Sequence, residues 1–284
     1  MPSAMVINTN IASLNSQRML SKTNEGLQTS MERLSSGLRV NSAKDDAAGL
    51  SIADRMTSQI RGMTVAMRNA NDGISMAQTA EAGMGNITET LQRMRDLALQ
   101  AANFGSVSSG DREKLQTEFK QLGTEVLRII ENTEFNGKKI LNGSLSNAVF
   151  QVGPNTSTNN QISITVSNLE LMSGLNQLFG DVASIGSNAL FSNVMSAIAH
   201  IDTAISKIDN FRATLGAIQN RFSATISNLQ SSIENQSAAR SRIMDADFAT
   251  ETANLSRAQI LQQAGTAMLA QANQSTQNVL QLLQ

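Results

Sequence analysis

The fold of this chain is decided by residues 52–101, which read IADRMTSQIRGMTVAMRNANDGISMAQTAEAGMGNITETLQRMRDLALQA. From Ile60 onward, apolar side chains recur at spacings of three or four residues without a gap. A repeat of about 3.5 residues over this length is typical of a coiled-coil helix. One continuous helix here would be about 75 Å long at about 1.5 Å per residue. The stripe comprises Ile60, Met63, Met67, Ala70, Ile74, Ala77, Ala80, Met84, Ile87, Leu91, Met94, Ala98 and Ala101, with Ile52 and Met56 upstream.

Two further segments have the same period, so three helices can share one apolar seam. The connector at 104–111 is rich in Gly and Ser and short enough to make its flanking helices antiparallel neighbours. We predict helices over about 45–103, 111–131 and 194–237. The predicted fold is mainly α, with a long antiparallel coiled-coil rod and a small β-hairpin element. The two further stripes are Leu115, Phe119, Leu122, Val126 and Ile129, and Val194, Ile198, Ile201, Ile205, Ile208, Phe211, Leu215, Ile218 and Phe222.

The two ends of the chain carry apolar stripes of a different kind. Asn, Gln, Ser and Thr surround them, and further apolar residues such as Leu20 and Leu269 lie on a second face. A helix that is apolar on more than one side needs more than one partner, and alone it is weakly ordered. We therefore predict a polymerisation interface at Ile7, Ile11, Leu14, Leu27, Met31, Leu34, Leu261, Met268, Val279 and Leu282.

A connector separates the first terminal helix from the rod. Ser35, Ser36 and Gly37 interrupt the first helix, and Ser42 with Asp45 supplies capping residues for the next one. Both chain ends belong at the same end of an antiparallel rod. We predict a discontinuous terminal-helix polymerisation domain, 1–44 with 238–284, and a rod domain at 45–237.

The middle of the chain is its one strand-like part. Phe150 and Val152 alternate with polar residues, and Ile162, Ile164 and Val166 do the same beyond a turn-rich stretch. This pattern predicts a β-hairpin within about 140–166. The glycine-containing stretch 167–193 is predicted as a loop region with room for one short helix.

Composition and charge exclude several functions. The net charge of −1 gives no electrostatic drive toward nucleic acid or a membrane surface, and no apolar run is long enough to span a membrane. The N-terminal stretch lacks the charged and apolar regions of a signal peptide, so export without a cleaved leader is expected. One His and no Cys exclude the usual zinc sites, and His200 has no evident catalytic partners. We expect no enzyme activity, no cofactor and no metal.

Three features of the rod allow more than one interpretation. The methionines of the stripe fit a core better than a promiscuous binding surface. Gly62 and Gly73 are either tolerated within a long helix or permit close approach by a neighbouring subunit. The charged residues near the connector are either a solvated, capped helix start or a set of inter-subunit salt bridges. These charged residues are Lys44, Asp45, Asp46, Asp54 and Arg55.

Several long motifs resemble those of bacterial flagellins. They are MVINTNIASL at 5–14, RLSSGLRVNSAKDDAAG at 33–49, LQRMRDLALQAAN at 91–103, EFNG at 134–137 and ANLSRAQILQQAG at 253–265. The resemblance covers roughly 1–143 and 194–284, in the same order as in the family. The residues left between are too few for the large outer domains of many flagellins, so this chain resembles a short form without them.

The resemblance implies a function and a set of partners. Flagellins polymerise into the helical filament that the flagellar motor rotates, with terminal helices inside and the variable middle facing outward. The resemblance implies a homopolymer, type III export, and an extracellular location on the flagellum. It also implies contacts with a flagellar export chaperone, the filament cap protein and the hook–filament junction protein.

One further implication concerns host recognition. Flagellins detected by the vertebrate Toll-like flagellin receptor carry a patch on the rod, whose positions map here to Gln92, Arg93, Leu97, Gln100 and Glu118. Gln92, Arg93, Gln100 and Glu118 lie off the apolar stripe, so they can face outward. The same residues are equally compatible with contacts between subunits. The resemblance therefore predicts recognition of the monomer and not of the polymer.

Three other functions are compatible with parts of the pattern. A hook–filament junction protein resembles flagellin at both ends but does not form long filaments. An intracellular coiled-coil scaffold would fold alone and remain inside the cell. A secreted hydrolase would need a catalytic set that the sequence does not show.

Overall fold

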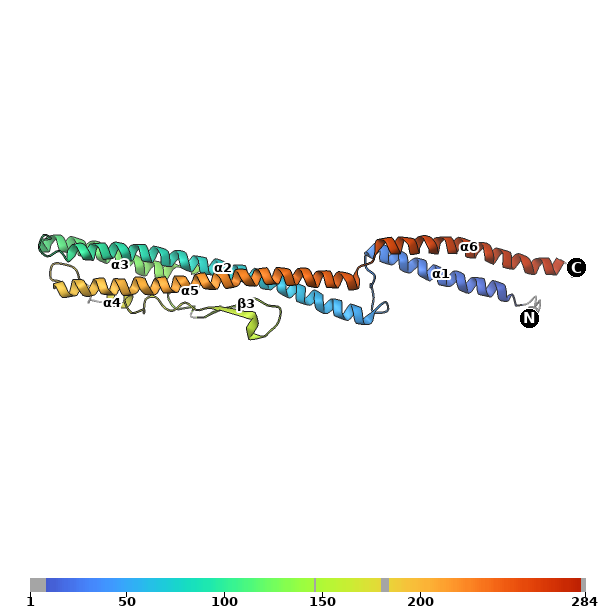
Figure 1. Cartoon of the computed structure of the whole chain (residues 1–284), viewed down its shortest axis with the longest axis horizontal. Helices are drawn as coiled ribbons and strands as arrows, with labels where there is room; N and C mark the ends of the chain where they lie inside the picture. Colours follow the sequence, from blue (N-terminus) through green and yellow to red (C-terminus); the bar gives the residue numbers. More distant parts are fainter. Residues whose placement is uncertain (1–8, 146, 180–183, 282–284) are drawn as a thin grey trace. The chain divides into compact units, whose positions relative to one another are not determined.

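The computed structural model describes residues 9–145, 147–179 and 184–281, and Figure 1 shows its helices in the colours of the sequence. Helices account for 74% of the chain, which confirms the prediction of a mainly α fold. The chain divides into two compact units. The terminal unit comprises residues 1–58 and 234–284, and the long-helix unit comprises residues 59–233.

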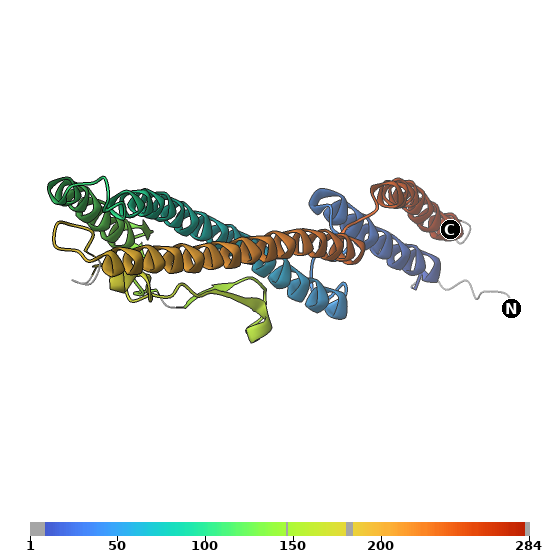
Figure 2. The ribbon, with the colours of Figure 1, turned by 60° about the vertical axis from the view of Figure 1, so that its left-hand side comes forward.

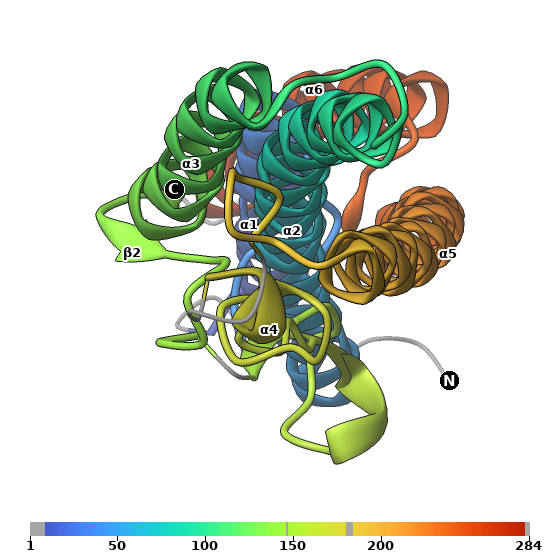
Figure 3. The same ribbon diagram turned by 90° about the vertical axis from the view of Figure 1, so that its left-hand side faces the viewer.

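Three helices build the long-helix unit: α2 (Ala47–Ala101), α3 (Ser109–Asn132) and α5 (Phe191–Met244). Gln219 of α5 donates to Glu81 of α2, whereas Asp202 pairs with Arg95, so α5 runs antiparallel to α2. Figure 3 looks along the helices and shows α2 flanked by α3 and α5. Both α2 and α5 continue without a break into residues of the terminal unit. Because these helices cross the division between the units, the predicted domain boundaries at residues 44 and 238 remain predictions.

The predicted seam forms the core of this unit. Most side chains on the stripe of α2 from Met63 onward are buried, together with those that face them from α3 and α5. Ile60, Met67 and Ile74 are half-buried, and Ile52 is 38% exposed. The antiparallel pairing of long helices from the two halves of the chain confirms the predicted architecture. Fully buried members include Met84, Ile87, Leu91 and Met94 of α2, Val126 and Ile130 of α3, and Val194, Ile201, Ile208 and Phe222 of α5.

The glycines of α2 allow close contacts within the subunit. A Cβ at Gly73 would lie 2.6 Å from the tip of the Phe222 ring, and a Cβ at Gly62 would lie 3.0 Å from Cβ of Pro154. Gly73 therefore admits an aromatic ring from α5, and Gly62 admits the turn of the β-hairpin. Residues of the same chain occupy both positions, which favours close packing within the subunit over the alternative of approach by a neighbouring subunit.

Two small antiparallel sheets lie beside the helices. Strand β3 (Ala148–Gln151) pairs with β4 (Gln161–Ile164) in the register Phe150 to Ile162, within the stretch predicted as a hairpin. Strand β1 (Glu134–Phe135) pairs with β2 (Lys138–Lys139) across a turn in which Asn136 and Gly137 have φ values of 50° and 73°. This second hairpin was not predicted, although Asn-Gly is the strongest short-range signal for such a turn.

A short stretch before α5 is tied to α3 by polar side chains. Gln116 accepts from the backbone N–H of Ile185 at 2.6 Å, and Glu113 accepts from the N–H and hydroxyl of Ser187 at 3.1 and 2.8 Å. These bonds hold the pKa of Glu113 below its ordinary value. The predicted loop region 167–193 also contains α4 (Leu175–Phe179), and short 3₁₀ helix η1 (Thr158–Asn160) lies before β4.

The terminal unit contains the helices α1 (Ile11–Ser36) and α6 (Phe248–Gln281), which Figures 1 and 2 show side by side. Gly37, with φ of 71°, ends α1 through a bond from its N–H to the carbonyl of Arg33. The connector after α1 pairs with the connector before α6, because the N–H of Ala246 donates to Gly37 and that of Arg39 donates to Met244.

Acidic side chains cap the helices that leave these connectors. Asp46 accepts from the N–H of Gly49 at 2.8 Å, and Asp247 accepts from the N–H of Ala249 at 3.0 Å. Asp45 accepts from the N–H and hydroxyl of Ser42, and these bonds lower its pKa. Two members of the charged cluster near the connector, Asp45 and Asp46, thus stabilise helix starts within the subunit.

Candidate interaction surface of the terminal helices

The contact between α1 and α6 is unusually polar for a helix pair. Ser13 and Ser30 are the buried residues of α1, and Glu251 of α6 is 7% exposed. The hydroxyl of Ser13 donates to Asn273 at 2.9 Å, and Gln262 donates to Asn24 at 2.8 Å. The most deeply buried side chains of the pair are therefore small or polar, while Leu20, Leu27 and Leu34 of α1 and Leu255 and Leu269 of α6 are half-buried.

Large apolar side chains of the same helices remain exposed. Five residues of the predicted interface, Ile11, Leu14, Met31, Leu261 and Met268, are between 51% and 71% exposed. A helix pair normally buries such side chains, since each Leu or Ile contributes about 1.5–3 kcal/mol on burial. The outward placement leaves this apolar surface without cover in the isolated subunit.

The remaining residues of the predicted interface are placed differently. Leu27 and Leu34 are half-buried on α1. Ile7 and Leu282 lie outside the described residues, and Val279 belongs to α6 with a side chain outside the description. The sequence prediction omitted three exposed apolar residues, because they fall off the spacing of its stripes. They are Met19, Phe248 and Ile260.

A groove of about 490 Å³ runs between α1 and α6. Met19 and Leu261 contribute apolar walls, and Arg33 and Glu251 lie in the same groove. Their ion pair is long, at 4.0 Å, and Nε of Arg33 is buried with no hydrogen-bond partner. A buried donor of this kind costs about 1–3 kcal/mol unless an acceptor reaches it. In the isolated subunit, the Nε of Arg33 in this groove therefore lacks a hydrogen-bond acceptor.

The predicted receptor patch divides between surface and core. Arg93 of α2 binds Glu118 of α3 through Nε at 3.0 Å and Nη2 at 2.7 Å, and both side chains are exposed. Gln92 and Gln100 are also exposed. Leu97 is only 2% exposed because it packs in the seam. A surface patch here can contain four of the five predicted residues, and Leu97 can contribute only by supporting them.

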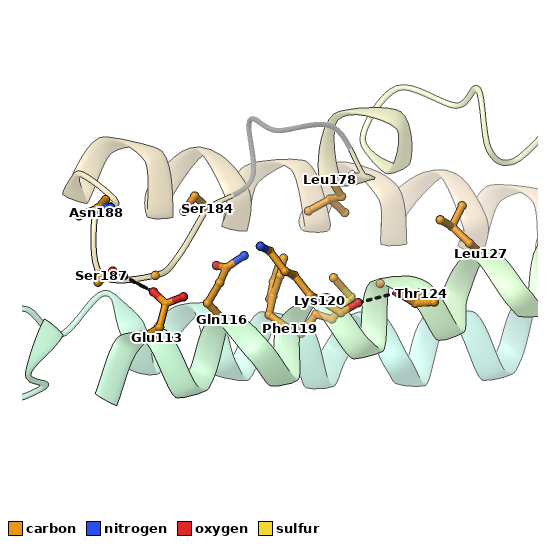
Figure 4. A pocket seen from close by; sticks show the side chains of 13 residues that line it. Glu113, Gln116, Phe119, Lys120, Thr124, Leu127, Leu178, Ser184, Ser187 and Asn188 are labelled. Atoms are coloured by element: carbon orange, nitrogen blue, oxygen red, sulfur yellow. Dashed lines mark hydrogen bonds between the residues drawn. The ribbon is translucent and has the colours of Figure 1, made fainter. Parts of the chain in front are cut away.

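Three observations concern a catalytic site, a metal site and a membrane-spanning helix. Figure 4 shows a cavity of about 500 Å³ between α3 and the stretch before α5, in which Glu113 and Lys120 are the ionisable lining residues and Glu113 is bonded to Ser187. Glu113 accepts from the hydroxyl of Ser187, but the lowered pKa of this carboxylate makes it a weak general base. In the described ranges no group of three or more His, Asp or Glu residues could hold a metal ion. Within those same ranges, no helix combines the length and apolar character needed to cross a membrane.

Comparisons with known proteins agree with this arrangement. Residues 7–146 match the bacterial flagellin N-terminal helical region, and residues 198–283 match the bacterial flagellin C-terminal helical region. The flagellin of Bacillus subtilis strain 168 is 43% identical over 305 residues, which cover 98% of this chain and 100% of the relative. Flagellin B of Vibrio anguillarum is 39% identical over 375 residues, which cover 99% and 100%. That alignment is longer than this chain of 284 residues, so the Vibrio relative carries additional residues.

A solved structure shares the fold at lower sequence identity. It is described as a flagellar hook-associated protein from Vibrio parahaemolyticus, with a TM-score of 0.61 and 16% identity. The match covers 71% of this chain and 100% of that one. At this identity the likeness concerns the fold alone.

Proposed function

This chain belongs to the bacterial flagellins, a structural, non-enzymatic family that forms the extracellular flagellar filament, and from this premise we propose that its terminal helices α1 and α6 carry the principal contacts between subunits. The observation that supports this proposal most is the number of large apolar side chains that the helix pair leaves exposed. The pair buries Ser13 and Ser30, whereas Ile11 and Met268 are 71% and 62% exposed. Exposed apolar side chains that recur along both helices of a pair support an interaction site.

The geometry of the pair suits an open polymer. Apolar residues lie on both α1 and α6 and on more than one face, so one subunit can contact several neighbours. A heterologous contact that does not close on itself generates a helical filament. The proposed interface comprises Ile11, Leu14, Leu27, Met31, Leu34, Leu261 and Met268 among the described side chains, and further Ile7, Val279 and Leu282.

The experiment that tests this proposal is seeded growth of filaments from purified subunit, followed by negative-stain electron microscopy. We expect long, smooth filaments from the whole chain. Chains that lack residues 1–35 or 250–284 should not elongate the seeds, because each lacks one helix of the pair. Normal growth of either truncated chain would contradict the assignment of the interface.

The same experiment addresses the rival function of a hook–filament junction protein. Identity of 39–43% with flagellins over nearly the whole chain favours the filament subunit, against 16% with the hook-associated structure. Persistent monomers or short rods, under conditions in which another flagellin grows, would favour the junction protein.

Other partners follow from the family and are proposals for this chain. Type III export of the chain in an unfolded state is compatible with a sequence that contains no cysteine. An export chaperone would cover apolar terminal helices before assembly, and their exposure in the subunit supports that need. The filament cap protein and the hook–filament junction protein would contact the same helices at the two ends of the polymer.

We also propose that the monomer is recognised by the Toll-like flagellin receptor of vertebrate hosts through Gln92, Arg93, Gln100 and Glu118. The exposure of these four side chains on adjacent helices supports a common surface, with Arg93 and Glu118 held together by their ion pair. Arginine is enriched among residues that dominate binding energy at protein interfaces.

Removal of this ion pair should weaken recognition strongly. For monomer that carries Arg93→Ala with Glu118→Ala, we expect the half-maximal concentration in a receptor reporter assay to rise by at least about tenfold, as loss of an arginine hot spot does. A matched control is Arg95→Ala with Asp202→Ala, which removes the ion pair that joins α2 to α5 at a similar distance of 2.7 Å. An equal response from wild type and from the Arg93 and Glu118 variant would refute the patch.

A further inference from the structure

Two groups of methionines in this chain have opposite surroundings, while Met56, Met67, Met172 and Met244 are half-buried. Four on the α2 seam, Met63, Met76, Met84 and Met94, are at most 4% exposed. Three on the terminal helices, Met19, Met31 and Met268, are between 54% and 62% exposed. The same thioether is therefore shielded in the long-helix unit and open to solvent on the surface proposed for assembly. Met195 of α5, at 46%, is the other methionine with a largely exposed side chain among the described residues.

The exposed methionines share their surface with other apolar side chains. Met19 lines the groove between α1 and α6 together with Leu261, and Gly26 in the same groove leaves its floor open. Met31 lies on α1 beyond this groove, and Met268 lies on α6. A methionine side chain fills irregular apolar contacts well, because it is unbranched and polarizable. Each of the three can thus be covered when a neighbouring subunit packs on the helices.

We propose that Met19, Met31 and Met268 are oxidation sites through which hydroperoxides such as hydrogen peroxide switch off assembly of the free subunit. This inference rests on the proposed function of the terminal helices. The sulfur lone pair attacks one peroxide oxygen, an S–O bond forms, and the O–O bond breaks. The sulfur loses two electrons and becomes a sulfoxide, and the proton of the attacked oxygen passes to the departing oxygen. That oxygen leaves as water from hydrogen peroxide, or as an alcohol from an organic hydroperoxide.

Oxidation changes the surface without changing the fold of the subunit. A sulfoxide replaces an apolar thioether by a strongly polar, chiral group, which disrupts interfaces that depend on methionine. In the free subunit the new oxygen is solvated, because all three side chains are exposed. In the polymer it would be buried without a donor, which disfavours the assembled state. The buried seam methionines react last, so the long-helix unit stays folded.

The proposal predicts that assembly protects these methionines from oxidation and that their oxidation prevents assembly. Subunits already in a filament should keep Met19, Met31 and Met268 reduced, because neighbouring subunits cover them. Free subunits should lose assembly in proportion to sulfoxide at these positions. The change is reversible, since methionine sulfoxide reductases return the thioether with electrons from a dithiol.

The test compares the whole chain before and after brief treatment with hydrogen peroxide. Peptide mass spectrometry gives the sulfoxide at each position, and circular dichroism reports the fold of the treated monomer. Seeded growth then gives the critical concentration. We expect sulfoxide at Met19, Met31 and Met268 ahead of Met63, Met76, Met84 and Met94, an unchanged circular dichroism spectrum, and a critical concentration raised by about tenfold or more. Treatment with a sulfoxide reductase and a dithiol should reverse the rise.

A variant with Met19→Leu, Met31→Leu and Met268→Leu makes the test specific. The reference is the critical concentration of the untreated variant. We expect the ratio of the critical concentrations after and before peroxide treatment to stay near one. Met195→Leu is the matched control, and it should keep the full sensitivity of the wild type.

Three outcomes would overturn the inference. They are normal growth of subunits oxidised at all three positions, earlier oxidation of the seam methionines, and loss of growth in the treated triple variant equal to that of the wild type. Failure of the untreated chain to elongate seeds would instead overturn the proposed function, and the inference with it.

Discussion

Filament growth should stop in chains that carry Leu14→Glu or Leu261→Glu. The two leucines are 56% and 51% exposed in the subunit, so they contribute little to its own stability. Burial of a leucine in an interface contributes about 1.5–3 kcal/mol, and burial of an unpaired carboxylate in its place costs several kcal/mol more. Because every subunit repeats the substitution, the loss applies to every contact along the filament.

The measurement is the critical concentration for seeded growth, with circular dichroism of the monomer as a check on folding. Glu is a good helix former, so α1 and α6 should keep their helical content. Gln28→Glu is the matched control, since it adds the same charge to an exposed position of α1 without removing an apolar side chain. Long filaments from either leucine variant would show that the exposed apolar surface of α1 and α6 is not where subunits meet.

The second large effect is expected inside the long-helix unit, at the contact of Phe222 with Gly73. Phe222 is fully buried, and its ring meets that of Phe150 edge to face, with centroids 5.7 Å apart. Phe222→Ala should lower the free energy of unfolding by about 3–5 kcal/mol, the usual cost of removing a buried phenylalanine. Gly73→Ala should cost about 1–3 kcal/mol, because its Cβ would lie 2.6 Å from the ring.

Urea unfolding of the monomer measures both changes, and the double variant tests their origin. With the ring removed, an alanine at residue 73 meets no clash, so the double variant should lose less than the sum of the two single losses. Gly85→Ala is the control in the same helix, since its Cβ would have no neighbour within 4 Å. It should be neutral or stabilising by up to about 1 kcal/mol. Additive losses, or an equal effect of alanine at 73 and 85, would argue against the close contact.

Periodicity in the sequence was sufficient to predict the helices and the seam. Met84, Leu91 and Met94 recur at the period of a coiled coil, and they are buried in the structure. The pattern also located the β3–β4 hairpin through alternation around Phe150 and Ile162. These features are local in origin, because a repeat of 3.5 or 2 places side chains on one face whatever the partner is.

The same patterns could not identify the partner of each residue. Gly62 and Gly73 signalled a close approach, but only the folded chain shows that Pro154 and Phe222 make it. Leu97 belongs to a stretch that resembles a surface patch in the family, yet packing in the core of the long-helix unit leaves it only 2% exposed. The β1–β2 hairpin was missed because its strands are only two residues long, which is too short to show an alternation of apolar and polar residues.

The sequence by itself determined that this is a mainly α flagellin with apolar terminal helices, because the hydrophobic period and the motifs depend only on the order of residues. Only the tertiary structure decided how those helices use their apolar residues. The pair buries Ser13 and Ser30 through bonds such as that of Ser13 to Asn273, and it leaves Leu14 and Met268 outside. The physical reason is that periodicity shows which side chains share a face, whereas exposure depends on which face the rest of the chain covers.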